Sequence, residues 1–111
     1  MRGIVLALAL LPLPALAAPD MIAAQYSCER GAQVPVVYVN DGATSFAALQ
    51  VEGQQIVLEI AISASGARYA APADQPGYIW WGKGDEATLA WRDGPEGSDE
   101  TFIYRACVTQ Q

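Results

Sequence analysis

The sequence predicts an all-β domain folded as a small up-and-down antiparallel barrel of about eight strands. After residue 17, short apolar stretches alternate with turn residues along the whole chain, and no sustained helical period is present. The connections between the apolar stretches are of hairpin length, which favours pairing of each strand with the next. Closing such a sheet into a barrel, in preference to a sandwich, removes edges that an exported sheet would otherwise expose.

Residues 1–17 have the form of a secretory signal that is cleaved on export. A basic residue provides the positive start, and residues 4–11 form an apolar run that is far shorter than the roughly 20 residues needed to span a membrane. Residues 15–17 are the small-x-small pattern that precedes a cleavage site. We therefore expect residues 18–111 to form a single periplasmic domain. No lipid anchor is expected, because Cys28 stands too far from the apolar run.

The first half of this domain contains four candidate strands. Residues 34–39 are a β-branched run, with Pro35 near its start, where a missing backbone donor is tolerated. The Asn-Asp-Gly sequence at 40–42 is a strong turn signal, and residues 52–54 have the composition of a tight hairpin. The expected strands are 26–30, 34–39, 45–51 and 55–62. In the last of them, the alternating side chains of a half-buried strand are Ile56, Leu58, Ile60 and Ile62.

The second half alternates loops with three more candidate strands. Small and hydroxyl-bearing residues at 63–69 and two prolines within 70–76 predict consecutive loops. Lys83-Gly84-Asp85 predicts a turn, and residues 92–99, rich in glycine, proline and acidic residues, predict an exposed loop. The expected strands between these segments are 77–82, 86–91 and 101–108.

The chain is acidic. Twelve Asp and Glu residues against six Lys and Arg give a formal net charge of −6, which becomes −7 when Arg2 leaves with the signal. This charge argues against nucleic acid and against an anionic membrane surface as partners. It favours fast encounter with basic partners, although acidity of this kind also serves solubility alone.

The composition also argues against an enzyme. The chain has no histidine, which removes the usual general base near neutral pH and the commonest zinc ligand. Cys28 and Cys107 most simply form one disulfide in an exported protein, closing a loop of about 80 residues for roughly 4 kcal/mol of stability. Two free thiols are the alternative in a reducing compartment. The acidic residues are scattered through turns without calcium-loop spacing, so no metal or cofactor is expected.

Two segments are unusual for a small inert barrel. In residues 63–69, small residues permit close approach to a partner, and serine hydroxyls can donate to carboxylates. Arg68 and Tyr69, which end this segment, are residue types that anchor interfaces. In residues 80–87, Lys83 stands between two glycines at a turn. Each segment also has an ordinary interpretation, the first as a plain turn and the second as a solvated hairpin tip.

The order of these motifs is informative. A Ser-Gly-x-x-Tyr motif is followed by an aromatic pair and a Lys-Gly-x-x-Ala motif, and a cysteine flanks the set on each side. In this sequence they are Ser65-Gly66-Ala67-Arg68-Tyr69, Trp80-Trp81, Lys83-Gly84-Asp85-Glu86-Ala87, Cys28 and Cys107. Over essentially all of residues 18–111, this arrangement resembles the bacterial inhibitors of c-type lysozyme, a family with membrane-bound and periplasmic forms.

The resemblance implies a barrel, stapled by Cys28–Cys107, that blocks the cleft of a c-type lysozyme and so protects peptidoglycan. Ser65 would be the hydroxyl inserted against the catalytic carboxylates, and Lys83 would add a charge-assisted contact to an acid. Animal c-type lysozymes are typically basic, which complements this acidic chain. The expected lysozyme-binding residues, including the glycine of the close turn and the cation and tyrosine that support the loop, are Ser65, Gly66, Arg68, Tyr69, Lys83 and Gly84.

The sequence departs from the family pattern in one place and leaves other functions open. Residues 70–82 are longer than the family spacing, which affects the placing of one motif relative to the other. Ser63 competes with Ser65 as the inserted hydroxyl, although the glycine after Ser65 favours the latter. The absence of a lipid-attachment motif indicates the periplasmic form. The alternatives are an envelope assembly module using the same loops, an enzyme using Ser65 and Lys83, and a lipocalin-like barrel binding a small molecule with Trp80, Trp81 and Trp91.

Overall fold

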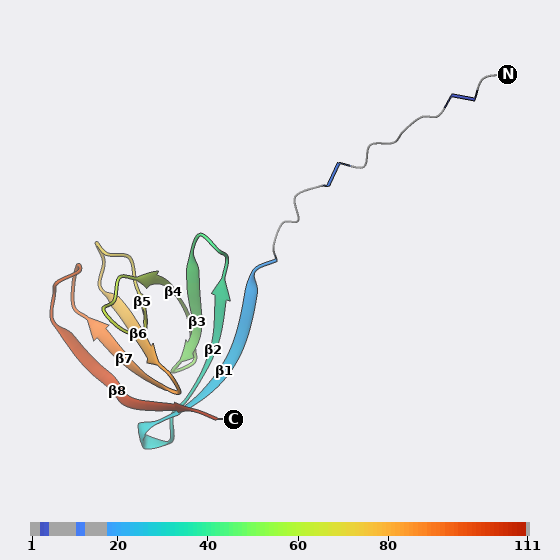
Figure 1. Cartoon of the computed structure of the whole chain (residues 1–111). Coiled ribbons are helices and arrows are strands. Elements are labelled where there is room, and N and C mark those ends of the chain that lie inside the picture. The colour runs from blue at the N-terminus through green and yellow to red at the C-terminus, as the bar shows by residue number, and fades with distance from the viewer. Residues whose placement is uncertain (1–2, 5–10, 13–17, 111) are drawn as a thin grey trace.

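The computed structural model describes residues 3–4, 11–12 and 18–110, and residues 20–109 form a closed antiparallel barrel (Figure 1). Each strand pairs with the next and the last pairs with the first, which confirms the expected all-β, up-and-down barrel. The signal expected at residues 1–17 lies outside the described residues, apart from 3–4 and 11–12. Within the described ranges, no helix is long and apolar enough to cross a membrane. The elements are β1 (Asp20–Cys28), η1 (Glu29–Gly31, a 3-10 helix), β2 (Gln33–Asn40), β3 (Ser45–Val51), β4 (Gln54–Ala61), β5 (Ala67–Ala70), β6 (Gly77–Lys83), β7 (Glu86–Arg92) and β8 (Glu100–Thr109).

Two of the connections are two-residue hairpin turns that use glycine. Between β3 and β4, Glu52 and Gly53 both have positive φ, at 50° and 80°. Two successive positive φ values are typical of a turn whose twist matches that of the flanking strands. Between β6 and β7, Gly84 has a φ of 57°, and Lys83 pairs directly with Glu86. Both turns lie where the sequence predicts them.

β1 differs from its prediction at both ends. It starts at Asp20, because residues 20–25 form a regular ladder with β2 in which Asp20 lies opposite Asn40. It ends at Cys28, since Arg30 takes a left-handed φ of 58° and the chain turns into η1. The expected strand over 26–30 is therefore placed too late, because pairing with the β-branched β2 sets the extent of β1.

β4 and β5 contain the second departure. The segment at 63–69 is not all loop: from Ala67 onward it forms β5, which pairs with β4 on one side and β6 on the other. β4 ends at Ala61, so Ile62 lies beyond the strand and is 98% exposed, while Ile60 is 40% exposed. The expected alternation is thus right for Leu58, which is buried, and wrong for Ile60 and Ile62. The physical reason is that the β4–β5 ladder spans only three residue pairs, so the end of β4 has little to cover it.

The core fills the interior of the barrel. Trp80 is fully buried, and the ring of Tyr26 meets it edge-on with centroids 4.9 Å apart. Trp81, the next residue along β6, points to the opposite face of the sheet, and Trp91 is exposed. The three tryptophans therefore line no common pocket, which disfavours the lipocalin-like alternative. The other buried residues of the main core are Val34, Val36, Ala47, Leu49, Val51, Leu58, Tyr69, Ala87, Leu89, Tyr104 and Cys107.

The barrel closes through a short seam. β1 and β8 pair over only three residue pairs, and at the end of this ladder Cys28 lies opposite Cys107. These two cysteines form the expected disulfide, with their Cα atoms 4.0 Å apart and 79 positions apart in the chain. In Figure 1, β1 and β8 meet close to the C-terminus and diverge away from it. A covalent link at this point compensates for the small number of backbone hydrogen bonds in the seam.

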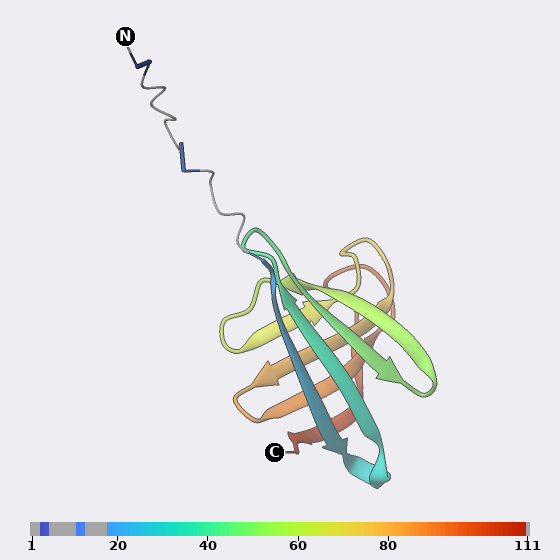
Figure 2. The same ribbon diagram turned by 90° about the vertical axis from the view of Figure 1, so that its right-hand side faces the viewer.

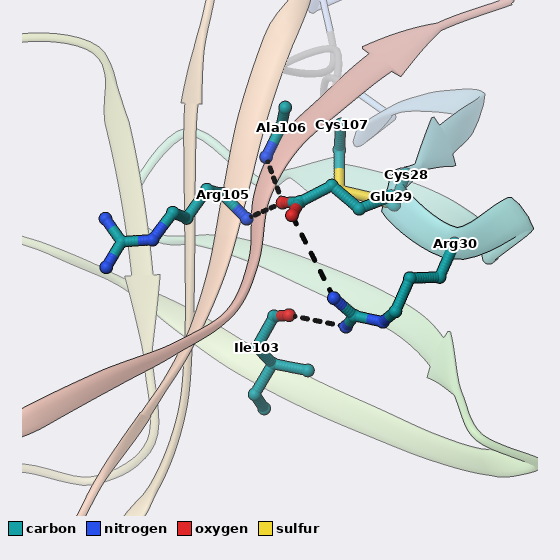
Figure 3. A network of polar contacts seen from close by, with 7 residues as sticks. All are labelled: Cys28, Glu29, Arg30, Ile103, Arg105, Ala106 and Cys107. Atoms are coloured by element: carbon teal, nitrogen blue, oxygen red, sulfur yellow. Dashed lines mark hydrogen bonds and ion pairs between the residues drawn. A yellow bond between two sulfur atoms is a disulfide. The ribbon is translucent and has the colours of Figure 1, made fainter.

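Side chains of η1 complete the seam (Figure 3). β8 has register shifts where it pairs with β7, and such bulges leave backbone groups without ladder partners. The Glu29 carboxylate accepts the backbone N–H groups of Arg105 and Ala106, the second at 2.8 Å. The Arg30 guanidinium donates to the carbonyl oxygen of Ile103 at 2.9 Å. Glu29 and Arg30 therefore fasten the end of β1 to the irregular part of β8.

The extra residues between the two motifs do not disturb their placing. The β5–β6 ladder is unbroken over its four pairs, and the added length forms the loop 71–76 at its far end. Arg92 holds this loop: its buried guanidinium donates to the carbonyl oxygens of Pro72 and Gln75, each at 2.9 Å. The motifs themselves lie at the other end of the ladder.

Candidate functional site

The Ser-Gly and Lys-Gly motifs lie side by side at one end of the β5–β6 pair. We call residues 62–66 the serine loop and residues 83–86 the lysine hairpin. Ala67, the first residue of β5, pairs with Gly82, the residue before Lys83, so the loop leaves the sheet beside the hairpin. Figure 2 shows both connections projecting on the left of the barrel, one above the other, near the C-terminus. Residues separated in sequence by the whole of β5 and β6 are thereby brought together.

The serine loop is folded on itself through hydrogen bonds that involve the backbone of Ser65. The Ser63 hydroxyl donates to the Ser65 carbonyl oxygen, and the Ser65 backbone N–H donates back to Ser63 Oγ at 3.3 Å. The indole N–H of Trp81 donates to the same Ser65 carbonyl at 2.8 Å. Ser65 is exposed, and no group among the described residues hydrogen-bonds its Oγ. Of the two competing serines, Ser63 is used inside the loop, while Ser65 retains a free hydroxyl.

Gly66 allows the serine loop to lie against β6. It has a φ of 67°, a left-handed conformation that favours glycine. A Cβ at this position would lie 2.4 Å from the Gly82 carbonyl oxygen and 2.6 Å from Lys83 Cγ. Real Cβ atoms essentially never come closer than 3.0 Å, so only glycine fits here without a shift of the neighbouring chain. The glycine of the motif is explained by this close approach.

The ring of Trp81, on the outer face of the barrel, lies close to the charged groups of two basic residues of the site. Lys83 Nζ lies 5.0 Å from the centre of the Trp81 ring, and the Arg68 guanidinium carbon lies 6.0 Å from it. Arg68 is also 3.6 Å from a carboxylate oxygen of Glu100, and its side chain is only 11% exposed. Lys83 is exposed, and in the described part of the chain it makes no ion pair. Arg68 thus has an ion-pair partner within the barrel, whereas the Lys83 ammonium has none among the described residues.

Tyr69 and Gly84 lie on the other side of these motifs, at the mouth of the barrel. Together with Tyr26, Tyr38, Gly66, Ala67 and Gly82, they line a hollow of about 330 Å³. Tyr69 is 7% exposed, and its ring packs against that of Tyr38 with centroids 5.5 Å apart. Burial raises the pKa of both hydroxyls above the ordinary tyrosine value, so they stay neutral. Tyr69, which is expected from the sequence to support the loop, therefore forms a wall of this hollow.

Two residues that position the site, Thr109 and Trp81, are absent from the lysozyme-binding residues expected from the sequence. Thr109, near the end of β8, donates its backbone N–H to the carbonyl oxygen of Asp85 at 2.9 Å and so braces the lysine hairpin. Cys107, two residues earlier, carries the disulfide, which links this brace to β1. Nothing in the sequence pattern identifies Thr109. Trp81 could have been identified, because one of two consecutive tryptophans in a strand must face outward.

The chain matches the family model described as membrane-bound lysozyme-inhibitor of c-type lysozyme over residues 26–96. It is 44% identical over 87 residues to the membrane-bound lysozyme inhibitor of C-type lysozyme from Pseudomonas aeruginosa, a match covering 76% of this chain and 65% of that protein. It is 38% identical over 71 residues to the protein of the same name from Cupriavidus necator, covering 64% and 54%. The chain thus spans between about half and two thirds of the length of these relatives.

Two solved structures share the fold. The crystal structure of Pseudomonas aeruginosa MliC in complex with hen egg white lysozyme gives a TM-score of 0.65 at 38% identity and covers 90% of this chain and 92% of that one. The crystal structure of PliC-St, a periplasmic lysozyme inhibitor of C-type lysozyme from Salmonella typhimurium, gives 0.66 at 25% identity and covers 83% and 100%. Because the family model matches well over half of the chain, this chain belongs to the family of membrane-bound lysozyme inhibitors of c-type lysozyme.

Proposed function

We propose that this chain inhibits c-type lysozyme by inserting the serine loop into the active-site cleft of the enzyme. The observation that carries the proposal is the pairing of two unused polar groups on adjacent connections. Ser65 and Lys83 are exposed, and neither the Ser65 hydroxyl nor the Lys83 ammonium has a hydrogen-bond or ion-pair partner among the described residues. A relative with the same fold has been crystallised in complex with hen egg white lysozyme, which supports the same kind of partner here.

The chemistry of the target suits these two groups. A glycosidase of the lysozyme kind works with two carboxyl groups that flank the scissile bond. A hydroxyl placed there donates a hydrogen bond to one of them, and an ammonium adds a charge-assisted contact. Together they occupy the position of the sugar ring and of the attacking water. The acidic net charge, −7 once Arg2 leaves with the signal, would accelerate encounter with a basic enzyme.

A location in the cell envelope follows from the same family, whose relatives are membrane-bound or periplasmic. We extend the proposal to export with cleavage after Ala17 and a periplasmic mature chain. The mass of the protein recovered from a periplasmic extract tests this directly. A mass that includes residues 1–17, or recovery only with membranes, would contradict it.

The functional test is lysis of peptidoglycan by a c-type lysozyme in the presence of the purified domain. Excess inhibitor should stop lysis, and an unchanged rate would show that the proposal is wrong. Ser65→Ala and Lys83→Met should each weaken inhibition by about 1–3 kcal/mol, roughly 5- to 150-fold. Methionine keeps an unbranched side chain at position 83 and removes the charge, together with the contact of the ammonium with the Trp81 ring. Ser98→Ala, in the connection between β7 and β8, is the matched control and should inhibit normally.

The two weakened variants, Ser65→Ala and Lys83→Met, should leave the unfolding midpoint nearly unchanged, because the two side chains are exposed and make no ion pair within the described residues. A double variant, Ser65→Ala with Lys83→Met, that still inhibits like the unmodified chain would place the contact elsewhere on the barrel.

A further inference from the structure

The hollow at the barrel mouth has a polar aromatic lining that the fold alone does not explain. We call it the tyrosine mouth; its lining residues are Tyr26, Tyr38, Gly66, Ala67, Tyr69, Gly82 and Gly84. It opens between the serine loop and the lysine hairpin, since Gly66 belongs to the first and Gly84 to the second. Behind it, Tyr38 accepts the indole N–H of Trp80 at 2.8 Å and shares a second hydrogen bond with Tyr26 at 2.8 Å.

A glycine keeps the mouth open where folding does not require glycine. Gly82 lacks the positive φ of Gly66 and Gly84, so its backbone conformation is open to other residues. A Cβ on Gly82 would lie 3.8 Å from the Tyr38 hydroxyl oxygen, an ordinary contact distance, and would therefore point into the mouth without a clash. Side chains at this position would fill the hollow. Glycine at position 82 therefore leaves free a volume in the mouth that a group from a partner can occupy.

Tyr69 contributes a hydroxyl that is not used inside the chain. The described residues supply no hydrogen-bond partner to its oxygen, although the neighbouring hydroxyls of Tyr26 and Tyr38 bond each other. This oxygen is not sealed in the core, because no fully buried side-chain oxygen among the described residues lacks a partner. Tyr69 lines both the mouth and a neighbouring hollow of about 340 Å³, which also has Asp20 in its lining.

The lining suits a cation. The charged groups of Arg68 and Lys83 lie over the Trp81 ring, and neither residue belongs to the lining of the hollow. What remains is tyrosine rings, neutral hydroxyl acceptors and, at the adjoining hollow, the carboxylate of Asp20. Aromatic faces attract ammonium and guanidinium groups, and tyrosine oxygens accept their hydrogen bonds. A carboxylate would meet no opposite charge here.

We propose that the tyrosine mouth receives a cationic side chain, an arginine or a lysine, from the rim of the lysozyme cleft. This inference rests on the proposed function, which places the serine loop and the lysine hairpin against that cleft. Insertion of the serine loop carries the mouth toward the enzyme surface beside the cleft. The contact is reciprocal: the inhibitor delivers Lys83 to an acid of the enzyme, and the enzyme delivers a cation to Tyr69.

The test uses two variants and one matched control. Tyr69→Phe removes only the unused hydroxyl, and Gly82→Ala places a methyl group in the mouth at ordinary contact distance. Tyr104→Phe is the control: Tyr104 is also 7% exposed, lies in β8, and takes no part in the tyrosine hydrogen bonds of the described residues. Calorimetric titration with a c-type lysozyme should show about tenfold weaker binding for Tyr69→Phe and Gly82→Ala, and no change for Tyr104→Phe.

A double-mutant cycle identifies the cation. Each arginine and lysine bordering the cleft of the enzyme is replaced by methionine, and each variant is titrated with the unmodified chain and with Tyr69→Phe. One position should show coupling, so that its effect falls several-fold when Tyr69 has lost its hydroxyl. Normal binding by Tyr69→Phe and Gly82→Ala, or absence of coupling at every position, overturns the inference. If Ser65→Ala and Lys83→Met still weaken binding in that case, the proposed function stands without it.

Discussion

Gly66→Ala tests how the two motifs are held together. Gly66 has a φ of 67°, a conformation that costs an L-residue about 1–2 kcal/mol. An added Cβ would lie 2.4 Å from the carbonyl oxygen of Gly82 and 2.6 Å from Cγ of Lys83. The lysine side chain can rotate away, but the Gly82 oxygen belongs to the backbone of β6. The start of β5 and the end of β6 must therefore separate.

The expected loss of unfolding free energy has two parts. Conformational strain accounts for about 1–2 kcal/mol, and forcing an atom into occupied space typically adds about 1–3 kcal/mol. Gly42→Ala is the matched control, because Gly42 has a φ of 73° and nothing within 4 Å of its added Cβ. Gly42→Ala should lose only the unfolding free energy that comes from conformational strain. The difference between the two variants, about 1–3 kcal/mol, measures the contact between the serine loop and β6.

Urea unfolding followed by tryptophan fluorescence gives both free energies from the linear dependence on denaturant. Binding to a c-type lysozyme is then measured by calorimetry in the absence of urea, where both variants are folded. Gly66→Ala should bind more weakly, since the shift moves Ser65, while Gly42→Ala should bind normally. Equal losses of stability in the two variants would refute the argument that Gly66 lies against β6.

Three further predictions use the same urea experiment. Glu29→Ala removes the acceptor of two N–H groups on β8 and should lower the unfolding free energy by about 1–2 kcal/mol. Reduction of the Cys28–Cys107 disulfide, which spans 79 positions, should lower it by about 4 kcal/mol. Burial raises the pKa of Tyr38 and Tyr69, so their stabilisation is complete below about pH 10. It should fall above that pH by up to about 1.4 kcal/mol per unit for each tyrosine, whereas a flat profile to pH 11 would contradict the burial argument.

The turns and the closed barrel were predictable because they depend on local chemistry. Gly53 and Gly84 mark hairpins through the conformation that they alone adopt easily, and the neighbouring strands follow from the turns. β5 was not predictable in this way. Its four residues, from Ala67 to Ala70, carry no strand pattern of their own, and the strand exists because β4 and β6 pair with it. The exposure of Ile62 has the same origin, since the end of β4 lies where this short ladder stops.

The site was predicted as a set of residues and not as an arrangement. Ser65 and Lys83 follow from the motifs, but their adjacency depends on the register of β5 against β6, which no local pattern encodes. Tyr69 was expected to support the loop, and its place in the lining of the barrel mouth, which follows from the alternation of side chains along β5, was not foreseen. Thr109 acts through a backbone N–H. Because a backbone N–H is present in every residue except proline, such a contact cannot be predicted from the residue type.

The rigidity of the serine loop separates this chain from a flexible inhibitory peptide. A flexible segment loses about 1–2 kcal/mol of backbone entropy per residue when it becomes ordered in a cleft. Here the ordering accompanies folding, because Ser63 and Trp81 hold the carbonyl of Ser65, and Gly66 lies against β6. These contacts use a carbonyl oxygen and an indole N–H, and they leave the Ser65 hydroxyl and the Lys83 ammonium for the partner. The same interactions that fix the loop in the free chain therefore lower the entropic cost of binding, and a variant that frees the loop should weaken binding even with both side chains in place.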